Sequence, residues 1–296
     1  MEYDVVVVGA GAAGLSAALV LGRAMRRVAV VDAGEPRNAP ADALHGYLSR
    51  DGMAPGDLLA EGRAEIARYG VELIEDRVVA VEPGFTVRLA GGATLSARRL
   101  LVTTGLRDEL PPVPGLAQRW GRDVVVCPYC HGYEVRDRPL GVLGEGPTGV
   151  LKALLVREWS ADIVLFPGAE PPSEQDAARL AARGIAVATG EITRVVAEND
   201  RLTGVELDGG RVVGREALFV NARFVPSDGL LTGLGAEVDE QGWVRVDPTG
   251  RTSVPGVWAA GNVVDPMAQL IIAAAAGSLA ASTINNELVL DLVPVA

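Results

Sequence analysis

Basic residues are scarce in this chain of 296 residues. Its 27 Lys and Arg residues, with Lys152 as the single lysine, stand against 38 Asp and Glu residues, so the net charge is −11. This acidity argues against nucleic acids and anionic membranes as partners. The N-terminus lacks a basic signal-peptide region, and the longest apolar helix candidate, Leu270–Ala281, is too short to span a bilayer. We therefore expect a cytoplasmic protein.

Cysteine and histidine are scarcer still, with two of each. Both cysteines lie in the segment Cys-Pro-Tyr-Cys-His-Gly-Tyr-Glu, at Cys127 and Cys130, followed directly by His131. A structural zinc site needs four ligands. Only His45 is left to join these three, and His131 adjoins Cys130, so we expect no metal. A disulfide across two residues restrains little of the unfolded chain, whereas such a pair suits redox cycling.

A glycine-rich loop near the N-terminus predicts a dinucleotide site. Residues 4–8, Asp-Val-Val-Val-Val, have the composition of a buried parallel strand. The loop that follows carries Gly9, Gly11 and Gly14, and the next strand ends at Asp32. These glycines allow a tight turn, approach of a pyrophosphate and close helix packing, and the acid suits a ribose.

A second glycine loop lies at residues 144–149 and is less complete. Its turn carries Glu145, a carboxylate near the expected pyrophosphate position. The strand after it, Asp162–Phe166, ends without a ribose-binding acid, and the next arginine beyond it is Arg179. Two such units suggest a flavin domain and a nicotinamide domain. NADPH binding by the second is doubtful, and a purely structural unit is an equal alternative.

Taken in order, these motifs resemble the low-molecular-weight thioredoxin reductase family. They are the first glycine loop, a Thr-Thr-Gly ending at Gly105, the Cys-x-x-Cys pair, the second glycine loop, and Val-Trp-Ala-Ala-Gly-Asn ending at Asn262. The resemblance implies an α/β fold of two Rossmann-like, FAD- and NAD(P)-binding domains, the second inserted into the first. We expect the FAD domain at 1–112 and 228–296, and the inserted domain at 113–227 carrying the cysteines.

The resemblance also implies which residues bind FAD and which carry the chemistry. Cys130 is expected to face the flavin and Cys127 the substrate, with His131 as acid or base. His45 is either a group that deprotonates the substrate or a structural histidine. A helix is expected to begin near Pro266. The implied cofactor-binding residues are Gly9, Gly11, Ala13, Gly14, Asp32, Gly105, Gly261, Asn262 and Gln269.

Two departures from ordinary thioredoxin reductases bear on the activity. His131 stands where they carry an acid after the second cysteine, and Pro167–Gln175 contains no basic residue. The motif looks like that of the FAD-dependent dithiol oxidases of the gliotoxin and holomycin type, which implies a small-molecule dithiol as substrate, oxygen as acceptor and a homodimer. The alternatives are an NADPH-dependent reductase of thioredoxin-like substrates and a flavoprotein redox sensor without turnover.

Overall fold

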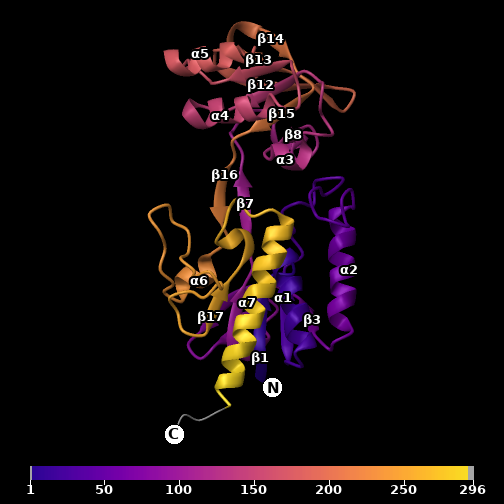
Figure 1. Cartoon of the computed structure of the whole chain (residues 1–296), viewed down its shortest axis with the longest axis vertical. Coiled ribbons are helices and arrows are strands. Elements are labelled where there is room, and N and C mark those ends of the chain that lie inside the picture. Colours follow the sequence, from indigo (N-terminus) through magenta and orange to yellow (C-terminus); the bar gives the residue numbers. More distant parts are fainter. Residues whose placement is uncertain (1, 293–296) are drawn as a thin grey trace. The chain divides into compact units, whose positions relative to one another are not determined.

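The computed structural model describes residues 2–292, which form two compact units (Figure 1). Unit 1 comprises residues 2–39, 46–107 and 224–292, and unit 2 comprises residues 40–45 and 108–223. The elements of unit 1 are β1 (Glu2–Val8), α1 (Ala12–Arg23), β2 (Val28–Asp32), α2 (Pro55–Ala67), β3 (Glu72–Glu75), β4 (Val78–Glu82), β5 (Thr86–Leu89), β6 (Thr94–Val102), α6 (Gly229–Gly233), β17 (Val257–Ala259), η3 (Gly261–Val263) and α7 (Leu270–Leu290). The chain passes between the units within β7 (Leu106–Glu109) and near the start of β16 (Arg223–Pro226).

A seven-stranded sheet forms the centre of unit 1. Its order is β3-β2-β1-β6-β5-β4, and β17 pairs with β6. The strands β3, β2, β1, β6 and β17 are parallel, whereas β4, β5 and β6 form an antiparallel meander. Alternate residues of β1 face opposite sides. Val5 and Val7 pack in the core with α1 and α7, and Val6 and Val8 pack in the core under β4, β5 and α6.

Unit 2 contains η1 (Ala117–Arg119), β8 (Val124–Val125), α3 (Pro128–His131), β9 (Leu140–Leu143), α4 (Gly146–Val156), β10 (Ile163–Phe166), α5 (Glu174–Ala182), β11 (Ala186–Val187), β12 (Ile192–Glu198), β13 (Arg201–Leu207), η2 (Asp208–Gly210), β14 (Val212–Gly214) and β15 (Ala217–Val220). It is built around a five-stranded parallel sheet with the order β11-β10-β9-β15-β8. Its core includes Leu140 and Val142 of β9, Val150 of α4 and Leu180 of α5. A three-stranded antiparallel sheet, β12-β13-β14, closes a second core in this unit.

The fold class predicted from the sequence is confirmed, because each glycine loop follows a buried parallel strand and leads into a helix. The predicted start of the last helix near Pro266 is wrong. Helix α7 begins at Leu270 with Gln269 as its N-cap and continues to Leu290. In the part of the chain that the structure describes, no helix combines the length and apolar character needed to cross a membrane.

Candidate active site

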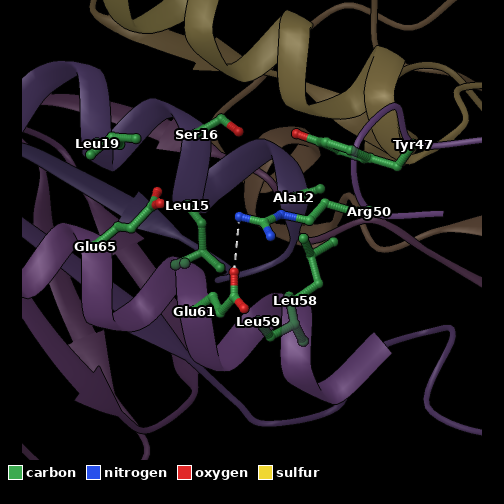
Figure 2. A pocket seen from close by; sticks show the side chains of 11 residues that line it. Ala12, Leu15, Ser16, Leu19, Tyr47, Arg50, Leu58, Leu59, Glu61 and Glu65 are labelled. Carbon is green, nitrogen blue, oxygen red and sulfur yellow. Dashed lines mark ion pairs between the residues drawn. The ribbon is translucent and has the colours of Figure 1, made fainter. Parts of the chain in front are cut away.

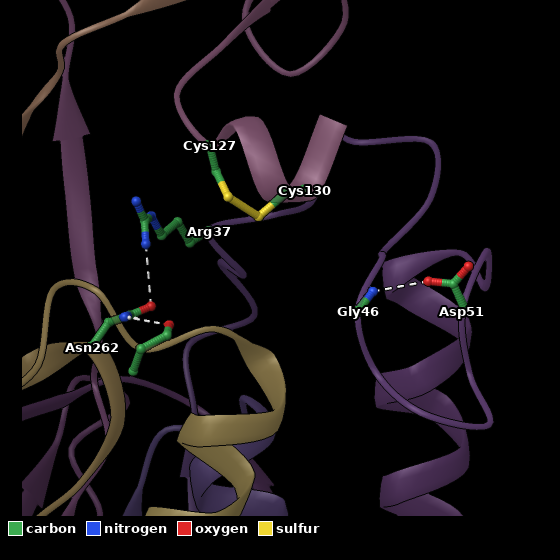
Figure 3. The surroundings of a disulfide bond; sticks show 7 residues. Arg37, Gly46, Asp51, Cys127, Cys130 and Asn262 are labelled. Carbon is green, nitrogen blue, oxygen red and sulfur yellow. Dashed lines mark hydrogen bonds between the residues drawn. A yellow bond between two sulfur atoms is a disulfide. The ribbon is translucent and has the colours of Figure 1, made fainter. Parts of the chain in front are cut away.

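The two cysteines lie at the start of the short helix α3 and form a disulfide (Figure 3). Cys127 is the N-cap residue with extended backbone, and Pro128 takes the first helical position, where its missing N–H is not needed. Their Cα atoms are 5.3 Å apart, within the range that a disulfide requires. The Cys130 N–H donates to the Cys127 carbonyl at 3.2 Å. The turn therefore holds the two sulfurs within bonding distance of each other.

Aromatic packing fixes this helix within unit 2. A Cβ atom at Gly132 would lie 2.7 Å from the Trp159 ring, so only glycine allows the indole to pack at this point. The Tyr129 ring meets the Trp159 ring edge-on, with centroids 5.8 Å apart. Pro128 is buried beneath the turn, whereas Tyr129 is exposed. The cysteine pair thus stands on a packed base in unit 2.

Three titratable side chains gather around the cysteine motif. His45 Nε2 lies 3.4 Å from the Glu134 carboxylate, although the two residues are far apart in the sequence. Burial lowers the pKa of His131, while the Glu134 charge opposes this effect and His45 reinforces it. The structure therefore brings both predicted histidines to Glu134. Glu134 was not predicted, although it ends the motif and lies three residues beyond His131.

The first glycine loop has the shape of a phosphate cradle. A Cβ atom at Gly9 would lie 2.6 Å from the Thr103 carbonyl oxygen, and one at Gly14 would overlap the Gly9 carbonyl. A Cβ atom at Gly11, in contrast, would meet no atom within 4 Å. The loop is therefore closed on its packed side and open at Gly11, above the N-terminus of α1. This arrangement fits a pyrophosphate.

Asp32 ends β2 beside this cradle. Its Oδ1 accepts a hydrogen bond from the Ala10 N–H at 3.1 Å, and its Oδ2 pairs with Arg63 of α2 at 2.7 Å. Both residues line a hollow of about 500 Å³, together with Gly34 and Arg77. Arg63 Nε is buried without a hydrogen-bond partner. A hollow beside a ribose-type acid, lined also by the Arg63 and Arg77 side chains, fits the AMP half of FAD.

Asn262 and Gln269 belong to the loop that leads into α7. The Asn262 side-chain amide donates to the carbonyls of Asp265 and Ala268, at 2.9 and 3.0 Å, and its oxygen accepts from Arg37 at 3.2 Å (Figure 3). This amide therefore shapes the loop in the structure. A Cβ atom at Gly46 would lie 4.0 Å from Gln269 Oε1, so the Gln269 side chain lies close to the loop after Pro40–His45.

Ala13, Gly105 and Gly261 occupy packing and turn positions. A Cβ atom at Gly261 would lie 3.1 Å from the Ala13 Cβ, which is also covered by α7. Gly105 has a φ of 69°, and its carbonyl accepts from the Ser227 N–H at 2.9 Å. These contacts fix the backbone around the first glycine loop.

The second glycine loop has its own carboxylate over the end of β10. A Cβ atom at Gly168 would lie 3.3 Å from Glu145 Oε1, so this acid lies at the tip of the strand where a nucleotide ribose is usually recognised. Arg179 pairs with Asp176 at 3.1 Å. Arg157 donates to the carbonyls of Arg183 and Ser160. Both of these arginines are thus engaged with other groups.

A further hollow of about 180 Å³ lies between α1 and α2 (Figure 2). Its walls include Leu15 and Leu58, and Arg50 pairs with Glu61 beside it at 3.0 Å. None of the predicted site residues lines this hollow. Among residues 2–292, no three His, Cys, Asp or Glu side chains are grouped so as to hold a metal ion.

Comparison with known proteins identifies the family. A model of the pyridine nucleotide-disulphide oxidoreductases matches residues 3–278. The chain belongs to this family. It is 31% identical to thioredoxin reductase sirT of Leptosphaeria maculans, over 96% of this chain and 94% of that protein.

Solved structures of this family share the fold over nearly the whole length. The crystal structure of HlmI matches with 55% identity and a TM-score of 0.94, covering 97% of this chain and 93% of that one. The putative thioredoxin reductase TrxB from Bacillus anthracis matches with 32% identity and a TM-score of 0.94, covering 98% and 100%. The oxidoreductase is therefore a thioredoxin reductase-like flavoenzyme, and its family binds FAD.

Proposed function

We propose that this oxidoreductase is an FAD-dependent dithiol oxidase, which closes a disulfide in a small-molecule dithiol and passes the electrons to oxygen. The observation that carries the proposal is the Cys127–Cys130 disulfide on α3, with His131 directly after it. A disulfide is the oxidised form from which dithiol oxidation begins. An adjacent imidazole suits the removal of protons from thiols near neutral pH.

The proposed exchange takes place at the two sulfurs. A substrate thiolate attacks Cys127 Sγ, the Cys127–Cys130 bond breaks, and Cys130 leaves as a thiolate. The second substrate thiolate then attacks the substrate sulfur of this mixed disulfide, and Cys127 leaves as a thiolate. The substrate departs as a disulfide, and its two electrons remain on the enzyme dithiol. Two protons are released from the substrate thiols in the process.

His131, Glu134 and His45 are proposed to handle these protons. Because burial lowers the pKa of His131, its imidazole is neutral at pH 7 and can accept a proton from a thiol. His45 Nε2 lies 3.4 Å from the Glu134 carboxylate, so this pair is proposed to relay that proton away from the thiols.

FAD is proposed to be held by the first glycine loop, with Gly9, Gly11 and Gly14 around the pyrophosphate and Asp32 on the ribose. FAD bound there would supply the acceptor for the two electrons of the enzyme dithiol and would allow their transfer to oxygen, with hydrogen peroxide as the product. Gly105, Gly261 and Gln269 are proposed to shape the rest of its site, with Ala13 and Asn262 supporting them through the packing and loop contacts described above. Unit 1 would thus be the FAD-binding domain, and unit 2 the inserted domain.

We also propose that NADPH is a poor reductant of this enzyme. An NADPH 2′-phosphate usually needs an arginine partner, and Arg157 and Arg179 are engaged elsewhere. Glu145 at the tip of β10 would repel the phosphate. Loss of one charge-assisted hydrogen bond costs about 1.5–3 kcal/mol, or about one to two decades of affinity.

The second candidate is an NADPH-dependent reductase of a thioredoxin-like protein. It is favoured by the names of two relatives and by the glycine loop before α4. For either activity we propose a homodimer by analogy with the family. We also propose a cytoplasmic setting, where a lone pair of cysteines is more often redox-active than structural.

Aerobic turnover separates the two candidates. A panel of small dithiols is incubated with enzyme and air, and disulfide and hydrogen peroxide are quantified. The oxidase should form both in a 1:1 ratio without NADPH. NADPH consumption that depends on thioredoxin, with no peroxide from any dithiol, would support the reductase instead.

A further inference from the structure

Arg63 of α2 has a guanidinium whose donors are mostly unused. Its Nη2 donates to Asp32 at 2.7 Å. Within residues 2–292 this is the one hydrogen bond that the side chain makes, and the buried Nε has no partner. Arginine carries five N–H donors in a planar fork. An ion pair with Asp32 alone therefore leaves most of its hydrogen-bonding capacity unsatisfied in a side chain that is only one-third exposed.

The position of Arg63 indicates what would satisfy these donors. Both Asp32 and Arg63 line the hollow of about 500 Å³ beside the first glycine loop. Asp32 is the acid expected on the adenosine ribose, and acids at such positions accept hydrogen bonds from ribose hydroxyls. Arg77 also lines the hollow, but its guanidinium pairs with the Glu35 carboxylate at 2.6 Å. Arg63 is thus the cation beside Asp32 with donors to spare.

We infer that Arg63 is a cofactor-binding residue, which holds Asp32 in place and donates hydrogen bonds to the AMP half of FAD. A planar guanidinium suits the acceptors of this half, which are the phosphate oxygens, the ribose oxygens and the adenine ring nitrogens. Because Arg63 comes from α2 and Asp32 from β2, a bound nucleotide would join these two elements. The inference rests on FAD binding by the family and is independent of whether the substrate is a dithiol or a disulfide.

The test measures FAD retention by the holoenzyme. Arg63→Met keeps the apolar stem and removes the donors, and Arg63→Lys keeps the charge but loses the fork. Each protein is diluted stepwise, and released FAD is followed by its fluorescence. We expect Arg63→Met to weaken FAD binding about ten- to a hundredfold, the effect of losing a charge-assisted hydrogen bond. The FAD affinity of Arg63→Lys should lie between those of Arg63→Met and the parent protein.

Arg50→Met is the matched control. Arg50 also pairs with a carboxylate of α2, Glu61, but lines the separate hollow between α1 and α2 (Figure 2). This variant should retain FAD as the parent does. Thermal unfolding followed by circular dichroism checks that each variant is folded.

Combining the change with Asp32→Asn separates direct contact from an effect through Asp32. If Arg63 contacts the nucleotide, Arg63→Met weakens FAD binding further in the Asp32→Asn background. Retention of FAD by folded Arg63→Met at the parental level would overturn the inference. So would a double variant that binds FAD as well as Asp32→Asn alone. Neither result would bear on the dithiol oxidase proposal, which is tested by turnover.

Discussion

At the scale of single residues, the role proposed for His131 as a base depends on its protonation state. Burial holds the pKa of this imidazole below its usual value of 6.5. The folded protein therefore prefers the neutral form, and His131 becomes charged only as the pH falls through this lowered pKa. Activity that depends on neutral His131 should persist at neutral pH and be lost on the acid side. General base catalysis is worth about 10²–10⁴-fold, so His131→Ala should lower kcat/KM for dithiols within this range.

Glu134→Gln should shift the pH profile of the reaction. The Glu134 charge raises the pKa of His131 against the effect of burial. Its removal should therefore move the acid limb of kcat/KM to lower pH, measured by peroxide formation across a pH series. Glu158→Gln, which removes a carboxylate paired with Arg183 in the same unit, is the control and should leave the limb in place. An unchanged limb in Glu134→Gln would show that Glu134 does not act on His131.

Serine variants of the two cysteines should trap different states. Cys130→Ser leaves Cys127 able to form a mixed disulfide with the substrate, because the Cys130 thiolate that would attack Cys127 Sγ and expel the substrate is gone. Addition of oxidised substrate should raise the mass of this variant by one substrate molecule, as intact-protein mass spectrometry would detect. Cys127→Ser should take up none. Equal labelling of both variants would contradict the assignment of Cys127 as the cysteine that the substrate attacks.

The sequence allowed prediction of those site residues that belong to a recognisable motif, but not of the contacts between distant residues. Cys127, Cys130 and His131 stand together in one short segment, and Asp32 follows a recognisable strand. The pairing of His45 with Glu134 joins residues 89 positions apart, and Arg63 meets Asp32 across 31 positions. Contacts of this kind depend on the packing of loops and helices, for which a single sequence gives no local signal.

At the scale of elements, the contact between α1 and α7 supports the first glycine loop. A Cβ atom at Gly277 of α7 would overlap the backbone carbonyl of Ala13 in α1. The two helices therefore approach closely only because this position is glycine. Ala13 lies two residues beyond Gly11, so the contact also fixes the helix end that faces the cradle.

Gly277→Ala should destabilise the protein by about 1–3 kcal/mol, as forced overpacking of a core usually does. Urea unfolding monitored by circular dichroism would measure this change in the free energy of unfolding. Gly233→Ala in α6 is the matched control, since its Cβ would have no atom within 4 Å. That change should be neutral or slightly stabilising, because alanine favours helix over glycine. Equal stability of Gly277→Ala and the parent would show that α1 and α7 can separate freely.

Helix α4 holds the single lysine in an unusual state. Burial lowers the pKa of Lys152 to about 8 from 10.5, and its Nζ donates to the Val220 carbonyl at 2.6 Å. The neutral, reactive amine is therefore present from about pH 8 upward. Acetylation of Lys152 by acetic anhydride, followed by peptide mass spectrometry, should rise with a midpoint near pH 8. The same measurement on the protein unfolded in urea should give an acetylation midpoint near pH 10.5. A midpoint near pH 10.5 in the folded protein would refute the lowered pKa of Lys152.

Element boundaries were predictable where a strand or a capping glycine marked them. Strand β2 ends at Asp32 as predicted, because an apolar run stops there. The start of α7 was missed because Pro266 looks like a first helical residue. In the structure the Asn262 amide and the Asp265 carboxylate bind backbone groups of this segment, and a loop forms instead. Side-chain bonds of this kind compete with helix formation and are hard to foresee.

At the scale of the whole molecule, the order of motifs along the chain was enough to predict two Rossmann-like folds. The pattern of strand, glycine loop and helix occurs twice, and each time its strand lies between two parallel neighbours in the middle of a sheet. The sequence gives no sign that residues 40–45 pack with unit 2 while their neighbours on both sides belong to unit 1. Because residues 40–45 pack with unit 2, His45 lies beside Glu134 of the cysteine motif.

The central claim concerns the direction in which electrons move through the whole enzyme. Anaerobic titration of the holoenzyme, with flavin absorbance recorded after each addition, tests it most directly. A small dithiol should bleach the flavin at the rate of turnover, and NADPH or NADH at the same concentration should do so only slowly. The oxidase account would be contradicted by micromolar affinity for NADPH together with flavin reduction at catalytic rates, while dithiols leave the flavin oxidised.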